Sequence, residues 1–568
     1  MPELHLDLRQ TLSHRVHAEL RCSPSSHRLG LAMPRWTPGS YLLREYIGHL
    51  EGLVITQQSR ALAPRRLTPF RWELELDSLE PLLIRYTLQA TELTVRTAHL
   101  TGEHGFLPLA GIALEVDGQR WSPYRLSLAL PDGWEGFVPL PQQADGSWLA
   151  PSFDALIDTP VEAGPHPGHR FSVAGVPHRW VGWGGDLPAQ DPAWLADVEQ
   201  VCLACCRLMG QQRPVADDYL FVLHLTEQGY GGLEHDNSTV LQFGRRRLRT
   251  PDGRRRLLQL VAHEYLHQWN VRRLRPAELA PIDYGRAVVV PTLWFAEGVT
   301  SYVDQLLPHA AGCCTAEAVL ADLSEELSRY KSSQGRFVQS LRSSSEEAWV
   351  KLYRPHAHAG NQQISYYLKG AVLALVLDLR LRQRGSWIGV VLQQLWTSHG
   401  RHRRGYGEAD LVRAFASQDS ELATLLPHWL NSTEDPPLEE LLASVGLQLV
   451  AIPGSKPHAG WQLEQRPGAG LWIQRVQRNG AAQQAGLQVG DELIAAQGER
   501  LRTLEDLDLL LKQPQHETCE LLICRDGLLH NLRLVVSAPE PERWELQVDA
   551  QAEAGSQQRR EAWLALRP

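Results

Sequence analysis

His263–Asn270, with the sequence HEYLHQWN, is the stretch that decides most about the fold and the chemistry of this chain. On an α-helix His263 and His267 are four residues apart, so both imidazoles project from one face toward one point, as zinc ligands do. The carboxylate of Glu264 then reaches a water on the same metal without being a ligand. Thr250-Pro251 matches the N-cap and first-turn proline of such a helix. Because two helical histidines also occur at this spacing by chance, a third ligand has to decide the assignment.

Glu297 lies in the next predicted helix, which opens within Leu293–Tyr302. One interpretation is a glutamate on a helix surface. The residues around it are strongly apolar, however, and a buried carboxylate needs a partner. A carboxylate from a second helix would complete a His₂Glu zinc site with one open position. The sequence therefore favours His263, His267 and Glu297 as the ligands of one zinc ion.

The composition, with 43% hydrophobic and 21% charged residues in 568, is typical of a soluble globular protein of several domains. The net charge of -9 gives no reason to expect a nucleic-acid partner. No apolar run is long enough to cross a membrane, and the N-terminus lacks the basic and apolar regions of a signal peptide. Eight cysteines in so long a chain do not predict a disulfide framework, and we expect Cys202 and Cys205 to be buried small hydrophobes. These features predict a cytoplasmic protein.

Hydrophobic patterning changes along the chain. Residues 1–165 alternate with a period of two between Pro/Gly turns, which predicts an antiparallel β domain. The segment 315–450 is mostly helical by its periodicity. A linker at Pro453–Pro457 leads to a small β-rich unit, and the last ~30 residues are polar and predicted to be weakly structured.

A glycine-rich stretch, Gly229–His235, precedes the histidine motif and is not expected to be regular. Gly231 and Gly232 would let a ligand approach the backbone closely, and Glu234 after them could bind a cation. The alternative is a hairpin turn with a solvated glutamate. The Arg-rich stretch from 245 to 256 has no interleaved aromatics and is predicted to be a solvated loop.

Tyr366 and Tyr367 stand at the start of a predicted helix. A tyrosine in this position could donate a hydrogen bond to an oxyanion, although such a residue is more often part of a core.

These motifs, in this order, resemble those of the glycyl aminopeptidase family of zinc metallopeptidases (gluzincin type, PDZ domain-containing). The resemblance rests on Trp36–Tyr41, Asp158–Pro160, Gly231–His235, His263–Leu279, Leu293–Tyr302, Gly335–Tyr353, Tyr366–Gly370, Leu377-Asp378 and Ala485–Ile494. It implies an α+β multidomain fold. The implied parts are an antiparallel β N-terminal domain (1–165), a thermolysin-like catalytic domain (166–452, with a helical part at about 311–452), a PDZ-like β domain (458–538) and a C-terminal extension (539–568).

The same resemblance implies roles for the candidate residues. Zinc would be held by His263, His267 and Glu297, with Glu264 as the base. Glu234 would recognise a free substrate amine, together with Gly231, Gly232 and His235. Tyr367 would stabilise the oxyanion, although the adjacent Tyr366 leaves the choice between the two open. The PDZ loop that binds a peptide carboxylate would be Gly468, Ala469, Gly470 and Leu471, with a peptide adding as a strand beside Leu471–Gln474.

We therefore predict a hydrolase, a zinc-dependent aminopeptidase with one Zn²⁺ per chain. It would remove small N-terminal residues such as glycine and alanine by Glu-assisted attack of zinc-bound water. Its partners would be peptides with a free N-terminus and a peptide ligand of the PDZ-like domain, with no nucleic acid and no membrane. Two alternatives remain: a zinc endopeptidase, and a PDZ peptide-binding adaptor with a vestigial active site. The intact set of ligands and base argues against the adaptor, and the sequence leaves the oligomeric state open.

Overall fold

The computed structural model describes residues 1–455, 458–466, 470–511 and 518–568. These residues form two compact units. The first contains Met1–Val290, Leu306–Cys314 and Gly389–Gly407, and the second contains Pro291–Gln305, Thr315–Ile388 and Glu408–Pro568. Gly468 and Ala469, two residues predicted for the PDZ-like loop, lie outside the described residues.

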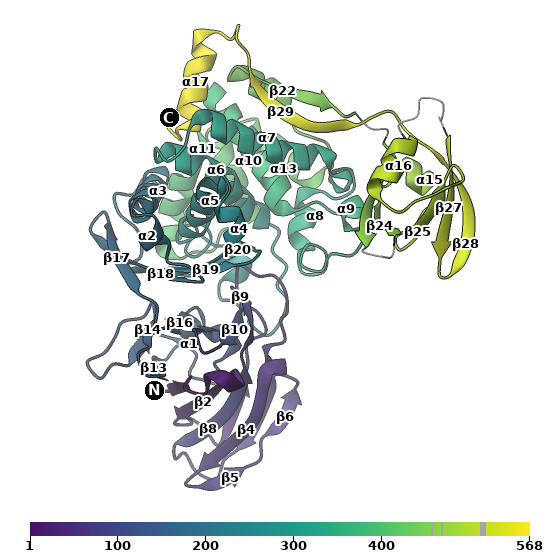
Figure 1. Cartoon of the computed structure of the whole chain (residues 1–568). Helices are drawn as coiled ribbons and strands as arrows, with labels where there is room; N and C mark the ends of the chain where they lie inside the picture. Colours follow the sequence, from purple (N-terminus) through teal and green to yellow (C-terminus); the bar gives the residue numbers. More distant parts are fainter. Residues whose placement is uncertain (456–457, 467–469, 512–517) are drawn as a thin grey trace. The chain divides into compact units, whose positions relative to one another are not determined.

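The N-terminal part of the first unit is built from β-sheets, as its period-two pattern predicted (Figure 1). The largest sheet has the order β15 (Trp148–Ala150), β13 (Tyr124–Ala129), β1 (Glu3–Asp7), β2 (Arg15–Cys22), β8 (Leu82–Gln89), β4 (Leu50–Gln57), β5 (Arg60–Leu62). A second has the order β12 (Glu115–Val116), β3 (Arg28–Ala32), β7 (Arg71–Glu75), β6 (Arg65–Thr68). A third has the order β14 (Glu135–Phe137), β16 (Pro160–Gly164), β11 (Gly105–Pro108), β10 (Thr97–Leu100), β9 (Thr91–Thr94). Within these sheets the pairing of β1 with β13 is parallel and the other described pairings are antiparallel.

A mixed sheet follows, in the order β17 (Gly168–Val173), β18 (Val176–Trp183), β19 (Tyr219–Thr226), β21 (Ser238–Gly244), β20 (Tyr230–Glu234). β18, β19 and β21 run parallel, while the outer strands β17 and β20 are antiparallel to their neighbours. Two helices, α3 (Trp194–Leu208) and α5 (Gly253–Leu266), pack against each other and against this sheet (Figure 1). Cys202 and Cys205 are fully buried in α3, as predicted.

The glycine-rich stretch is regular, so that prediction was wrong. Tyr230–Glu234 forms β20, whose five residues pair with β21 from Tyr230↔Phe243 to Glu234↔Thr239. Gly231 has a φ of 157°, which is close to extended backbone and therefore fits a strand. Glycine has no side chain that favours a strand, so the sequence does not predict one here. The backbone hydrogen bonds to β21 stabilise the strand instead.

The Arg-rich stretch is not a solvated loop. Its first residues form the short helix α4 (Arg245–Leu248), and the later ones belong to α5, which begins at Gly253 with Asp252 as its N-cap rather than at Thr250-Pro251. Arg254 of α5 donates to Asp197 of α3 at 3.0 Å from Nε. These arginines bind neighbouring elements, which a pattern of charges alone does not reveal.

Helices dominate the second unit (Figure 1). It starts with the π-helical turn η5 (Trp294–Gly298), which continues into α6 (Val299–Ala310). The other helices of this unit are α7 (Ala316–Ser332), α8 (Leu341–Glu346), α9 (Ala359–Gln362), α10 (Tyr366–Gln383), α12 (Glu408–Ala416), α13 (Leu422–Asn431) and α14 (Leu438–Ser444). The helix α11 (Ile388–Ser398) lies, apart from its first residue, in the first unit.

The PDZ-like region is a β-unit with two short helices. Its strands follow the order β23 (Trp461–Arg466), β24 (Gly470–Val476), β25 (Glu492–Ala496), β27 (Thr518–Arg525), β28 (Leu528–Val535), with β26 (Glu499–Arg500) paired to β25. Its helices are α15 (Ala481–Gln484) and α16 (Leu504–Leu511). Two strands flank this region in the sequence, β22 (Leu447–Pro453) before it and β29 (Pro541–Val548) after it, and these two strands pair with each other.

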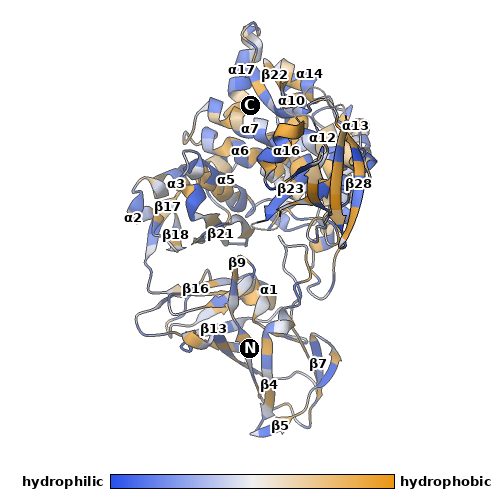
Figure 2. Cartoon of the chain, turned by 45° about the vertical axis from the view of Figure 1, so that its right-hand side comes forward, coloured by the Kyte–Doolittle hydropathy of each residue, from blue (hydrophilic) through white to orange (hydrophobic). Residues whose placement is uncertain are grey.

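The last thirty residues are ordered, contrary to the prediction. β29 is followed by α17 (Ala554–Leu564), and most of this helix is hydrophilic (Figure 2). Trp563 is nevertheless fully buried, and its Nε1 donates to the Tyr302 hydroxyl of α6 at 2.6 Å. One tryptophan therefore anchors a helix whose composition alone suggested a disordered tail.

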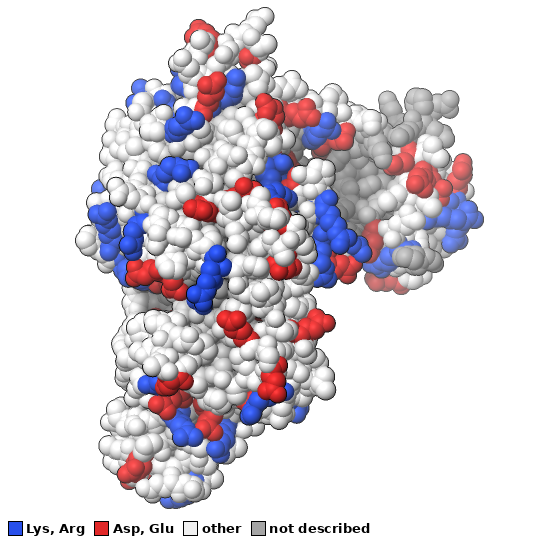
Figure 3. All heavy atoms as spheres, turned by 60° about the vertical axis from the view of Figure 1, so that its left-hand side comes forward, with Lys and Arg blue, Asp and Glu red and all other residues white. Residues whose placement is uncertain are grey.

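Among the described residues, no helix combines the length and the apolarity that a membrane span requires. On the face drawn in Figure 3, basic and acidic side chains are intermixed.

Candidate active site

The helix α5 carries the histidine motif and is held to the mixed sheet by Tyr265. The Tyr265 ring stacks on Phe221 of β19, and its hydroxyl lies 3.0 Å from His178 Nε2 of β18. This contact fixes the rotation of the helix, so that His263 and His267 share one face. Their rings are 4.6 Å apart between centroids and nearly perpendicular.

The tautomer of His267 suits a metal ligand. The regular helix ends at Leu266, and His267 is its C-cap with αR geometry. Its Nδ1 lies 2.6 Å from the Asn270 carbonyl oxygen, which can only accept, so Nδ1 carries the hydrogen. In a neutral imidazole Nε2 then carries the lone pair, the arrangement found in zinc-bound histidines. The donor set of this helix therefore fits a zinc ion.

Gly232 explains why glycine is needed in β20. The strand packs against α5, and a β-carbon at Gly232 would overlap the carboxylate of Glu264. The predicted close approach at this glycine is therefore to a side chain of the chain itself, the candidate base.

Glu234 lies at the end of the same strand and is buried, with 4% of its surface exposed. Its Oε1 has no hydrogen-bond partner among the described residues. The backbone of Gly39, with a φ of 81°, lies against this carboxylate so closely that a β-carbon there would overlap it. Arg96 holds the two backbones together by donating to the carbonyls of Gly39 at 3.2 Å and Gly232 at 3.3 Å. Gly39 belongs to the Trp36–Tyr41 motif, so this motif lies directly against Glu234.

Glu234, Glu264 and His267 come together: one ligand atom from each lies within 4.8 Å of the others. All three are buried. The structure therefore places two carboxylates and an imidazole, all predicted site residues, around one point of the first unit.

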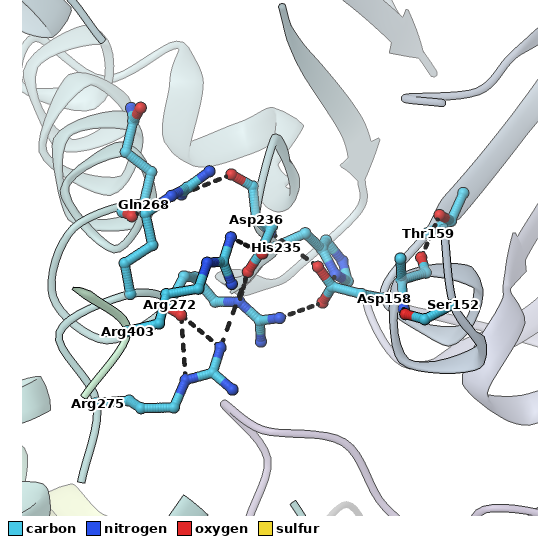
Figure 4. Close-up of polar contacts among 11 residues, drawn as sticks. Ser152, Asp158, Thr159, His235, Asp236, Gln268, Arg272, Arg275 and Arg403 are labelled. Atoms are coloured by element: carbon cyan, nitrogen blue, oxygen red, sulfur yellow. Dashed lines mark hydrogen bonds and ion pairs between the residues drawn. The ribbon is translucent and has the colours of Figure 1, made fainter. Parts of the chain in front are cut away.

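His235 lies in a polar network that follows β20 (Figure 4). Its Nδ1 lies 3.1 Å from Asp158 Oδ1, and Asp158 also accepts from the backbone N–H of Asp236 at 2.8 Å and pairs with Arg272 at 2.8 Å. Arg272 pairs in addition with Asp236 at 2.9 Å. Although burial opposes ionisation, the surrounding arginines hold the pKa of Asp236 well below its usual range. This network ties the Asp158–Pro160 motif to the end of β20, where His235 follows Glu234.

In the second unit, Glu297 is 1% exposed and lies in the π-helical turn η5. Such turns occur frequently at functional sites, because the extra residue per turn redirects side chains. The next residue, Gly298, crosses Gly370 of α10: a β-carbon on Gly298 would lie 2.6 Å from the Gly370 backbone. The glycines of the two motifs therefore allow η5 and α10 to touch.

Three tyrosine hydroxyls meet at the start of α10. Tyr353 lies 3.4 Å from Tyr366 and 3.2 Å from Tyr367, measured between hydroxyl oxygens. Tyr366 is fully buried, whereas Tyr367 is only partly buried. Tyr353 was not predicted as a site residue, because its partners lie more than ten residues away along the chain.

Lys369 follows these tyrosines and is 3% exposed. Its Nζ donates to the Arg336 carbonyl at 3.4 Å. Burial lowers the pKa of Lys369 to about 8.

The PDZ-like loop is only partly described, by Gly470 and Leu471. Leu471 and Trp472 of β24 are paired on both sides, with β23 and with β25. A peptide therefore cannot add beside Leu471 as predicted. One edge strand of the sheet, β23, borders a groove of about 340 Å³ lined by residues of β23 and α16.

Comparison with protein families assigns three segments. Residues 3–165 match the M61 peptidase N-terminal domain, residues 256–373 match the M61 glycyl aminopeptidase, and residues 472–525 match a PDZ domain. A search of curated proteins found no match.

Solved structures agree with the predicted α+β multidomain fold. The crystal structure of an aminopeptidase N family protein from Idiomarina loihiensis is 28% identical, with a TM-score of 0.91, over 99% of this chain and 100% of that chain. Yeast LTA4 hydrolase in complex with bestatin is 14% identical, with a TM-score of 0.50, over 78% and 70% of the two chains. Legionella pneumophila aminopeptidase A in complex with aspartic acid is 12% identical, with a TM-score of 0.50, over 97% and 57%. The last two likenesses show the fold alone.

Proposed function

We propose that this metallopeptidase, whose sequence matches the M61 glycyl aminopeptidase and its N-terminal domain, is a zinc aminopeptidase that removes small residues from free peptide N-termini. The buried Glu234 carboxylate beside Glu264 and His267 carries the proposal. Two carboxylates this close repel each other unless a cation joins them. The free α-amine of a peptide is such a cation at neutral pH. Glu234 is thus suited to hold a substrate by its N-terminus.

We propose His263, His267 and Glu297 as the ligands of one Zn²⁺ per chain. The Nδ1 hydrogen bond of His267 and the burial of Glu297 support this set. When bound, zinc polarises the scissile carbonyl and makes water a nucleophile at neutral pH. We expect His263→Ala to lose most of this zinc, while Glu264→Gln keeps it.

The protein side chains would then carry out proton transfer, oxyanion stabilisation and substrate binding. Glu264 takes a proton from the attacking water and returns it to the leaving amine. Tyr367, the less buried residue of the adjacent pair, donates to the oxyanion, and Tyr353 orients it. The amine of the substrate is held by Glu234.

The preference for glycine and alanine is supported by the space around Glu234. The backbones of Gly39 and Gly232 lie so close to the two carboxylates that neither position has room for a β-carbon. A large first side chain would have to displace these segments. The M61 glycyl aminopeptidase match points the same way.

Glu234→Gln tests the amine anchor. Losing a charge-assisted contact should weaken kcat/KM by ~2–3 kcal/mol, more than tenfold. N-acetylation of the substrate should slow the wild type strongly and the variant far less. Glu227→Gln, an exposed position just before β20, is the matched control and should behave as wild type.

The two alternative functions, an endopeptidase and an adaptor, predict different results in the same experiment. An endopeptidase would cleave free and N-acetylated peptides equally well at internal bonds. An adaptor with a vestigial site would show no zinc-dependent turnover, and Glu264→Gln would change nothing. Loss of activity by several orders of magnitude in Glu264→Gln with zinc retained would exclude the adaptor.

We also propose that the PDZ-like region binds part of a longer peptide as an added strand on the open edge of β23. The groove between β23 and α16 supports this placement. The region can be removed at the end of the strand pair β22 and β29. There the two ends of the chain lie side by side, because the Gly454 N–H donates to the Glu540 carbonyl at 3.2 Å. Replacing residues 456–538 by a short Gly/Ser loop should slow the cleavage of long peptides and leave dipeptides unaffected. Equal rates for long peptides would contradict a recognition role.

A cytoplasmic location is the last part of the proposal. All eight cysteines are free thiols, most of them buried, as in a protein kept in a reducing compartment. Alkylation of the unfolded protein from cell extract should modify all eight, whereas blocked cysteines would argue for another compartment.

A further inference from the structure

A second cluster of metal-ligand residues lies in the first unit and shares no residue with the candidate active site. His104 directly precedes β11, Glu162 lies in β16, and His224 lies in β19. All three side chains are fully buried. One ligand atom from each lies within 4.8 Å of the others. We call these residues the His104–Glu162–His224 cluster.

Glu162 is the centre of this cluster. Its Oε1 lies 3.0 Å from His104 Nδ1, and its Oε2 lies 2.9 Å from His224 Nε2. A third histidine, His166, approaches Oε1 to 3.3 Å with its Nε2, and its other ring nitrogen has no hydrogen-bond partner among the described residues.

The charge of Glu162 needs a counterion. A fully buried carboxylate is costly unless it is paired. In the part of the chain that the structure describes, every ion pair of this carboxylate is to a histidine. A buried carboxylate with three imidazoles around it offers the oxygen and nitrogen ligands of a divalent-cation site.

We propose that His104, Glu162 and His224 bind a second divalent cation of the zinc class, with His166 as the fourth ligand. Nitrogen and carboxylate oxygen ligands are those that zinc prefers in proteins. In a tetrahedral zinc site the ligand atoms are about 3.3 Å apart, so the contacts at Glu162 have to open by only a few tenths of an ångström. The cluster is closed to solvent, which indicates a structural site rather than a second catalytic one.

The surroundings of the cluster orient its rings. His104 stacks on Trp183 with 4.1 Å between ring centroids, and Phe106 meets the His224 ring edge-on at 4.8 Å. The second nitrogen of His104, Nε2, lies 3.0 Å from His99 Nδ1. A metal-bound histidine commonly donates its other N–H to such an acceptor. A cation here would bind the N-terminal strands β11 and β16 to the central strand β19 of the mixed sheet.

Metal counting separates this site from the proposed catalytic one. The purified full chain, stripped with a chelator and reloaded with Zn²⁺, should hold two zinc ions by elemental mass spectrometry. Glu162→Gln should hold one, and so should His263→Ala, each having lost a different ion. Glu103→Gln, an exposed neighbour of His104, is the matched control and should keep two.

A zinc-edge anomalous difference map of wild-type crystals makes the test independent of whether Glu162→Gln folds. A peak between Glu162, His104 and His224 would support the proposal. One zinc per chain in the wild type, lost in His263→Ala, with no peak at Glu162, would overturn it and leave the proposed catalytic zinc intact. Two zinc ions with neither at Glu162 would overturn it as well.

Discussion

At the scale of single residues, the contact between Gly232 and Glu264 sets the position of the candidate base. We expect Gly232→Ala to push the Glu264 carboxylate aside, because the added β-carbon would overlap it. Since general-base catalysis contributes roughly 10²–10⁴-fold, a displaced base should lower kcat by about tenfold or more. Gly48→Ala, which meets no atom within 4 Å, is the control, and circular dichroism checks that both variants fold. A Gly232→Ala enzyme with wild-type kcat would show that Glu264 is not confined by this strand.

Lys369 predicts a pH dependence of stability. Its pKa in the folded protein is about 8, below the ordinary value of 10.5, so the unfolded state binds more protons between these pH values. The free energy of unfolding should therefore rise with pH across this window. Lys369→Met removes the penalty and should be more stable than wild type at pH 7, by a few kcal/mol at most. Urea titrations at pH 7 and pH 10.5 check this: the difference should shrink at the higher pH, and a constant difference would contradict it.

The sequence predicted the chemistry of the site better than its contacts. The identities of His263, His267, Glu264 and Glu234 follow from motifs, because metal and proton chemistry restricts residue types and spacing. The approach of Gly39 to Glu234 does not, because the two residues are almost two hundred positions apart. For the same reason the contact of His235 with Asp158, which lies 77 positions earlier, was not predicted.

At the scale of elements, the crossing of η5 and α10 depends on two glycines. Gly298→Ala would bring a β-carbon to 2.6 Å from the Gly370 backbone, which cannot move without shifting α10. Overpacking of this kind costs about 1–3 kcal/mol, so the thermal midpoint should fall. Gly360→Ala in α9, whose nearest neighbour is a flexible arginine at 3.7 Å, should change it little. If both variants melt together with wild type, the crossing is looser than the structure shows.

Elements with a strong hydrophobic periodicity were predicted well. Elements whose structure depends on hydrogen bonds to a partner strand were not. The helix α10 was expected to begin at Tyr366 and Tyr367 and runs from Tyr366 to Gln383, because its apolar run is long. β20 was missed, since its glycines carry no strand signal and the partner strand supplies the order. The π-helical turn η5 was expected to be an ordinary helix, because its extra residue per turn leaves no mark in local composition.

At the scale of the whole molecule, α17 is held by Trp563. The Tyr302 hydroxyl that accepts from Trp563 also donates to Asp378 of α10 at 2.6 Å. Trp563 thereby joins α17 to Tyr302 of α6, which is the continuation of the turn that carries Glu297 and is itself bonded to α10, the helix that carries Tyr367. Trp563→Ala should cost about 3–5 kcal/mol of unfolding free energy, since a fully buried ring is lost.

Two further variants separate the contributions of the hydrogen bond and of the buried ring to this loss of unfolding free energy. Trp563→Phe keeps most of the ring and removes the hydrogen bond, so it should cost only about 1 kcal/mol beyond the smaller volume. Trp121→Ala, at an exposed tryptophan, should cost little. Urea unfolding measures all three, and a Trp563→Ala protein as stable as Trp121→Ala would mean that α17 is not docked in solution.

The pairing of β22 with β29 has a consequence for the order in which this protein is made. The ribosome releases β22 and the helices α6 and α10 well before β29 and α17, with the whole PDZ-like region synthesised in between. Until that region has emerged, β22 has no partner strand and Tyr302 has no tryptophan to bind. A nascent chain that has reached only residue 540 already contains every proposed catalytic residue, but its second unit, which carries Glu297 and Tyr367, still lacks β29 and α17. The helical part of this unit therefore reaches its final contacts only after β29 and α17 have been synthesised.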